Sequence, residues 1–92
     1  GDEGGGAWIG AAGLRAALRA SDGRGPATTL LHAACARFGA PASWPAQFTD
    51  AAALGAFAPD VLAARENDAV AREIVRAAAE ALASTARATG SG

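Results

Sequence analysis

Apolar residues in this chain recur every three to four positions, and no run of four to eight residues alternates between apolar and polar side chains. The first spacing places side chains on one face of an α-helix, whereas a half-buried β-strand needs the second. Segments rich in glycine and proline, which favour turns, separate the periodic stretches. The sequence therefore predicts an all-α chain of four to five helices without a sheet.

A strong turn signal separates the first two expected helices. The first runs from Ala7 to Ala20 and is followed by SDGRGP, where Pro26 cannot continue a helix. The second runs from Thr28 to Phe38, and Gly39 is placed to end it. Its apolar face includes Cys35, which we expect to be a small buried residue and not a reactive thiol.

The middle of the chain is rich in proline. Pro41 and Pro45 bracket Trp44, so we expect no regular helix there and a tryptophan that fills the gap between neighbouring helices. A short helix is expected after Thr49, whose side chain suits an N-cap. Pro59 marks either a break or the first turn of the next helix.

The last and longest helix is expected from Asp68 to Ala88, because Asn67-Asp68 is a typical helix start. Within it, Glu73 and Arg76 have the spacing of an i,i+3 ion pair. Residues 1–89 are predicted to form a single helical subdomain and residues 90–92 a flexible tail. We expect the first and last helices to pack on each other through small residues. The residues expected to supply most of the buried area are Trp8, Leu14, Val70, Ile74 and Leu82.

Composition excludes several functional classes. The formal net charge is −1, with acids and arginines interspersed, whereas binding to nucleic acid requires a clustered basic face. No apolar run approaches the length of a membrane span. His32 is the single histidine and Cys35 the single cysteine, so a metal site and an internal disulfide are not expected. The apolar residues are largely alanine, and each alanine buries little apolar area. The sequence therefore predicts a core of small buried area and marginal stability.

The first ten residues, GDEGGGAWIG, carry the most functional information. They contain no initiator methionine, and they read as the middle of a longer protein. Glycines permit close approach of a ligand to the backbone, and the carboxylates of Asp2 and Glu3 can accept hydrogen bonds from hydroxyl groups. Acidic residues ahead of a helix can equally cap it or favour its dipole. The residues alone leave both interpretations open.

Three stretches carry a resemblance to a known family: GDEGGGAWIG, LRAALRASDGRGPATTL and ENDAVAREIVRAAAEALA. In this order and spacing, from Gly1 to about Ala83, they resemble the N-acetylglucosamine kinase branch of the BadF/BadG/BcrA/BcrD-type ATPases. The family's turn usually reads GDEGS, and Gly5 stands where that serine would be. The resemblance implies a helical fragment from the C-terminal half of an actin-like (ASKHA) α/β sugar kinase. Because the family's GDEG aspartate contacts sugar hydroxyls, it also implies Asp2, together with Glu3, as substrate-binding residues.

Other parts of the family's machinery are missing from this sequence. It contains neither the DGGGT-type nor the GTGS-type phosphate loop nor the catalytic aspartate between them, and it has no lysine. The resemblance implies ATP and Mg²⁺ in a cytoplasmic parent enzyme, with an amino sugar and the remainder of the kinase as partners. We expect this chain alone to bind neither cofactor and to be inactive.

Two other functional classes compete with a kinase fragment. The alternative to a kinase fragment is a free-standing helical interaction or dimerisation module, which could form a homodimer. Phosphate loops upstream of Gly1 would favour the kinase, and an independent start codon near Gly1 would favour the module. A related ATPase that activates a radical enzyme is disfavoured, because an iron–sulfur cluster needs more cysteines than one.

Overall fold

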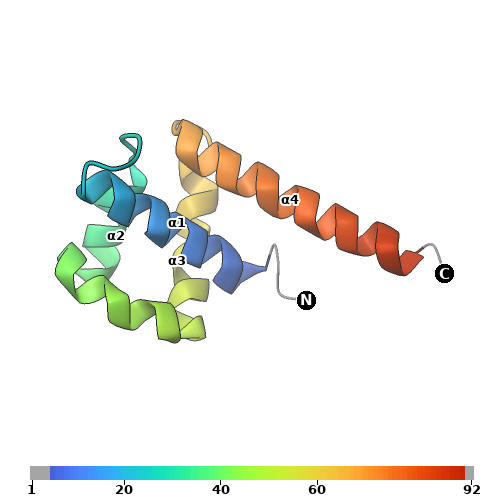
Figure 1. Ribbon diagram of the computed structural model, residues 1–92, viewed down its shortest axis with the longest axis horizontal. Helices are drawn as coiled ribbons and strands as arrows, with labels where there is room; N and C mark the ends of the chain where they lie inside the picture. Colours follow the sequence, from blue (N-terminus) through green and yellow to red (C-terminus); the bar gives the residue numbers. More distant parts are fainter. Residues whose placement is uncertain (1–4, 91–92) are drawn as a thin grey trace.

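The computed structural model describes residues 5–90, including the side chains of residues 5–86. Within that range the chain forms five helices and no strand, which confirms the predicted all-α class (Figure 1). The helices are α1 (Gly6–Ser21), α2 (Leu30–Phe38), the 3₁₀-helix η1 (Pro41–Thr49), α3 (Ala51–Ala64) and α4 (Ala69–Gly90).

The central helix is α1, which contacts each of the other four and packs most extensively against α3. A Cβ atom placed on Gly10 would lie 1.8 Å from the backbone oxygen of Leu54, and one on Gly13 would lie 2.5 Å from Val61 Cγ2. Two helices approach this closely only where no Cβ intervenes. Helices α1 and α4 also pack on each other, as predicted, but α1 packs more extensively against α3, because the glycines of α1 face α3.

The core lies between α1, α2, η1 and α3. Its largest fully buried side chains are Trp44, Phe57, Leu14, Leu30 and Val61. Of the five residues predicted to supply most of the buried area, Leu14 is fully buried, and Trp8, Val70 and Ile74 are half-buried against the core. Leu82 was predicted wrongly, since it is 52% exposed.

Helix α2 contacts the core through one narrow face. Leu30 and Ala34, which are one turn apart, are buried, and Phe38 packs against Phe57 with ring centroids 5.4 Å apart. Cys35 is exposed, contrary to the prediction. The physical reason is helical geometry, because each residue is rotated by about 100° from its neighbour, so the residue after Ala34 faces away from the core.

The proline-rich segment forms η1, although no regular helix was expected there. Hydrogen bonds of the i→i+3 type, such as that from the Ser43 amide to the Ala40 oxygen at 3.0 Å, close its tight turns. The predicted role of Trp44 is confirmed. Its side chain is completely buried, and its indole Nε1–H donates to the Gly39 oxygen at 3.0 Å.

Helix α3 differs from the prediction at its start and in its middle. The N-cap is Asp50, whose carboxylate accepts from the amides of Ala52 and Ala53 at 3.1 and 3.2 Å, and not Thr49. Pro59 lies inside α3 and does not interrupt the helix. An interior proline costs about 3 kcal/mol. Burial of Phe57 and Val61 on either side of it offsets that cost.

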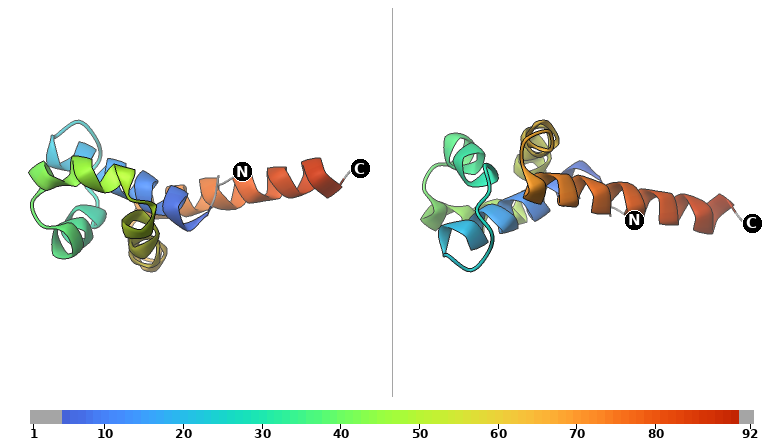
Figure 2. Two further views of the ribbon diagram at one scale, coloured as in Figure 1. Left: turned by 90° about the horizontal axis from the view of Figure 1, so that it is seen from below. Right: turned by 90° about the horizontal axis from the view of Figure 1, so that it is seen from above.

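Helix α4 begins one residue after the expected Asp68 and continues to Gly90, two residues beyond the expected Ala88. Its first half lies against the body of the molecule, and its second half extends away from the other helices (Figures 1 and 2). Gly90, expected in the tail, is helical, and residues 91–92 lie outside the described range. None of the helices within residues 5–90 combines the length and apolar character that crossing a bilayer requires.

Candidate functional site

The predicted sugar-binding residues, Asp2 and Glu3, lie outside the described residues. The described chain begins at Gly5, which is the N-cap of α1 with an extended backbone (φ −78°, ψ 177°) and without a side-chain hydrogen bond. The first turn of α1 contains no acidic residue. The acidic run therefore directly precedes a helix start that no described side chain caps.

Two polar residues near the start of α2 lie at the surface. His32 is exposed on α2. Arg24 is exposed in the turn after α1, where its guanidinium lies 3.5 Å from Asp22. Among the described residues, no group of three or more His, Cys, Asp or Glu side chains is placed to hold a metal ion.

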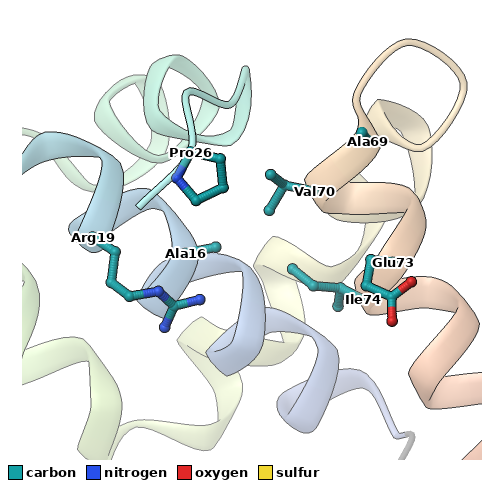
Figure 3. Close-up of a pocket in the computed structure, with 7 residues that line it drawn as sticks. All are labelled: Ala16, Arg19, Pro26, Ala69, Val70, Glu73 and Ile74. Carbon is teal, nitrogen blue, oxygen red and sulfur yellow. The ribbon is translucent and has the colours of Figure 1, made fainter. Parts of the chain in front are cut away.

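An apolar groove of about 370 Å³ lies between α1 and the first turns of α4 (Figure 3). The side chains of Val70 and Ile74 extend from α4 toward Ala16 and Pro26 on the opposite wall. The seven lining residues are Ala16, Arg19, Pro26, Ala69, Val70, Glu73 and Ile74. Sequence reasoning did not find this groove, because its walls come from segments about 50 residues apart.

The carboxylate of Asp68 holds the walls of the groove together. It accepts from the Thr28 hydroxyl at 2.7 Å and the Thr29 amide at 3.0 Å, just before α2, and from the Ala71 amide at 2.9 Å in the first turn of α4. One side chain thus serves the starts of two helices. Burial acts to raise the pKa of Asp68, but the hydrogen bonds from Thr28, Thr29 and Ala71 together outweigh it and lower the pKa.

A tight turn after α1 forms the wall of the groove that contains Pro26. The amides of Arg24 and Gly25 both donate to the Arg19 oxygen, at 2.9 and 3.2 Å, and Gly23 takes a positive φ of 73°. Glycine adopts that conformation without strain. Because the chain folds back here, Pro26 comes to lie over the groove beside Ala16 (Figure 3).

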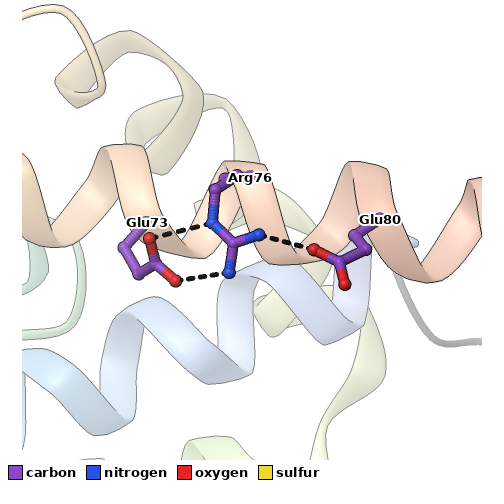
Figure 4. A network of polar contacts seen from close by, with 3 residues as sticks. All are labelled: Glu73, Arg76 and Glu80. Carbon is purple, nitrogen blue, oxygen red and sulfur yellow. Dashed lines mark hydrogen bonds and ion pairs between the residues drawn. The ribbon is translucent and has the colours of Figure 1, made fainter.

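The two charged residues of the groove differ in their partners. Glu73 accepts two hydrogen bonds from Arg76, from Nε at 3.0 Å and from Nη2 at 2.6 Å, and Nη1 of Arg76 donates to Glu80 (Figure 4). This predicted ion pair is confirmed, and the hydrogen bonds from Arg76 lower the pKa of Glu73. Arg19 makes no ion pair with any side chain of residues 5–86. Among the described side chains, Arg19 thus has no ionic partner, whereas Glu73 shares Arg76 with Glu80.

A second, more polar cavity of about 450 Å³ lies between α2 and α3, lined by Ala33, Ala36, Arg37 and Asp60. The Arg37 Nε donates to the Asp60 carboxylate at 2.6 Å. That hydrogen bond raises the pKa of Arg37. The two charged side chains that line this cavity therefore form an ion pair with each other.

Comparison with other proteins adds no relative. The chain matches no protein-family model, and neither the search of curated proteins nor that of solved structures finds a similar protein.

Proposed function

We propose that this chain is a helical part of an ATP-dependent amino-sugar kinase resembling N-acetylglucosamine kinase, to whose sugar site it contributes Asp2 and Glu3. The observation that carries the proposal is the run GDEGG, which immediately precedes α1 in the sequence. Carboxylates that accept hydrogen bonds from sugar hydroxyls discriminate strongly, because an analogue without the hydroxyl leaves a buried charge unpaired.

The packing of α1 supports this role. Ile9 and Leu14 are buried, and Gly10 brings the helix against the backbone of α3. The start of α1 is thus held firmly by the rest of the fold. Asp2 precedes the N-cap Gly5 by three residues in the sequence. A firmly held support is what a substrate-positioning residue requires.

The residues of this chain do not fit ATP and Mg²⁺. The sequence has no lysine to contact a phosphate, and the described part of the chain has no cluster of carboxylates placed to hold a metal. The proposal therefore assigns nucleotide, metal and catalytic base to the remainder of a cytoplasmic kinase. It assigns no catalytic residue to this chain, which by itself should not phosphorylate a sugar.

The test is Asp2→Asn in the kinase that contains this segment. Loss of a charge-assisted hydrogen bond, worth roughly 1.5–3 kcal/mol, should lower kcat/KM for N-acetylglucosamine about 10- to 100-fold and leave the KM for ATP nearly unchanged. The matched control is Asp22→Asn, which makes the same change at the exposed far end of α1. Unchanged sugar kinetics in Asp2→Asn would mean that Asp2 does not bind the sugar and that Asp2 and Glu3 only stabilise the start of α1.

One observation favours the second candidate, a helical interaction or dimerisation module. Ala78 is 3% exposed, whereas Leu82, one turn later on the same side of α4, is 52% exposed. The apolar side of α4 thus continues beyond the body that covers its first half (Figure 1). Sedimentation equilibrium of the purified chain separates the two candidates. A dimer that Leu82→Ser abolishes would favour the module, and a monomer would favour a part of a larger protein.

A further inference from the structure

We propose that α4 is a detachable arm, which leaves the body formed by α1, α2, η1 and α3 as one unit while that body stays folded. The contact of Asp68 with Thr28 and Thr29 is the latch that holds the arm in place. The arm and its latch are independent of the sugar-kinase proposal, since they involve only the packing of the described helices. Three features carry the proposal: the small apolar contact of α4, a body with its own core, and a polar latch beside a short turn.

The contact of α4 with the body buries mainly small side chains. Within the described part of α4, the buried side chains are those of Ala71 and Ala78, at 0% and 3% exposure. The larger apolar side chains of Val70, Ile74 and Val75 are only half-buried. Helix α1 also packs less extensively against α4 than against α3. Because hydrophobic stabilisation rises with the apolar area removed from water, α4 is held to the body less strongly than α1 and α3 are held to each other.

The body has a core to which α4 supplies no large side chain among the described residues. The largest fully buried side chains are Leu14 from α1, Leu30 from α2, Trp44 from η1, and Phe57 and Val61 from α3. The apolar groove of about 370 Å³ lies between α1 and the first turns of α4, so these two helices are incompletely packed there (Figure 3). Release of α4 therefore leaves this core in place, and regions with few buried apolar contacts open before the rest of a fold.

The latch lies at the start of α4. Asp68 is 7% exposed, and its carboxylate accepts from the Thr28 hydroxyl and the Thr29 amide at 2.7 and 3.0 Å. These two hydrogen bonds join the arm to the segment before α2, so they must break when the arm leaves. The hydrogen bond from the Ala71 amide lies within the first turn of α4 and can persist. Hydrogen bonds to a charged group contribute more than neutral ones, so one side chain carries a large share of the attachment.

A short turn supplies the hinge. Residues 65–68 join α3 to α4, and the first three of them are exposed. The second half of α4 extends away from the other helices, so it does not hold the arm to the body (Figures 1 and 2). Once the latch opens and the apolar contact separates, α4 stays attached through this turn alone. The open form exposes the side chains that docking buries, such as Ala71 and Ala78.

Amide hydrogen exchange of the purified 92-residue chain, followed by NMR, tests the proposal. The reporting amides are those of Val75 and Ala78 in the docked part of α4, and those of Leu14 and Val61 in the core. Under conditions in which exchange measures the opening equilibrium, the α4 amides should exchange about tenfold faster or more, relative to their intrinsic rates. They need only the release of the arm, whereas the core amides need global unfolding.

Two variants separate release of the arm from global unfolding. Asp68→Asn weakens the latch, which is lost in both events, so it should accelerate exchange of the α4 and core amides by about fivefold or more. Phe38→Ala removes a ring that packs on Phe57 within the body, with ring centroids 5.4 Å apart. That contact is intact when the arm alone is released. The variant should therefore accelerate exchange of the core amides by about fivefold or more and leave Val75 and Ala78 unchanged.

Controls address the charge and the fold. Glu66→Gln removes a carboxylate at an exposed residue in the same turn as Asp68 and should leave all exchange rates unchanged. Phe38→Leu, a milder change at the same position, replaces Phe38→Ala if that variant does not fold.

Three outcomes would overturn the proposal. Equal exchange of α4 and core amides in the natural sequence, or equal acceleration of both by Phe38→Ala, would mean that α4 opens only when the whole chain unfolds. Unchanged exchange of Val75 and Ala78 in Asp68→Asn would mean that these amides exchange by fraying from the free end of the helix and not by opening of the latch.

Discussion

The hydroxyl of Thr28 donates to the carboxylate of Asp68 at 2.7 Å, across 40 residues of sequence. The same carboxylate accepts the amides of Thr29 and Ala71, and its residue is only 7% exposed. This contact fixes the position of α4 relative to α2, and thereby the width of the groove beside it.

Asp68→Asn should lower the free energy of unfolding by about 1–3 kcal/mol at neutral pH. The amide keeps the shape of the side chain, but it offers one acceptor oxygen where three donors converge. Urea denaturation followed by circular dichroism measures the cost. Asp50→Asn, at the exposed N-cap of α3, is the comparison, and an equal or larger loss there would contradict a special role for Asp68.

The stability contributed by Asp68 should depend on pH. Its pKa in the folded protein is below the ordinary value of 3.8, so the ionised carboxylate stabilises the fold fully above that value. The contribution is lost as the pH falls below 3.8 and through the folded pKa. Thermal melts between pH 7 and 2 should therefore show a smaller acid destabilisation in Asp68→Asn than in the natural sequence. Parallel curves for the two proteins would be inconsistent with the lowered pKa.

Gly10→Ala should destabilise the protein by about 1–3 kcal/mol or more, because the added Cβ would meet the Leu54 backbone at 1.8 Å. The higher helix propensity of alanine, worth about 1 kcal/mol, only partly offsets this. Gly55→Ala is the matched control, since its Cβ would meet nothing within 4 Å. We expect that variant to be as stable as the natural sequence or slightly more stable in chemical denaturation.

Three leucine and isoleucine truncations should rank by burial. Leu14→Ala, at a fully buried residue, should cost about 2–5 kcal/mol in chemical denaturation. Ile74→Ala, at the half-buried groove wall, should cost less, and Leu82→Ala should cost close to zero, since Leu82 is 52% exposed. A large cost at Leu82 in the purified chain would mean that self-association covers it.

Local sequence patterns were sufficient to predict the helices. The three-to-four-residue spacing, the SDGRGP turn and Asn67-Asp68 placed α1, α2 and α4 to within two residues, because these signals act through the chain's own backbone. The burial of Trp44 could also be predicted, since a large aromatic in an alanine-rich chain must contribute much of the core.

Packing between distant segments decided the features that local sequence patterns did not predict. Pro59 stays inside α3 because Phe57 and Val61 are buried beside it, and Cys35 faces outward because Ala34 faces the core. The pairing of α1 with α3 depends on how closely Gly10 approaches Leu54, and the groove depends on the contact of Thr28 with Asp68. Helical periodicity indicates which face of a helix is apolar. It does not indicate which other helix covers that face, because that choice depends on the shapes of surfaces that meet only in the folded chain.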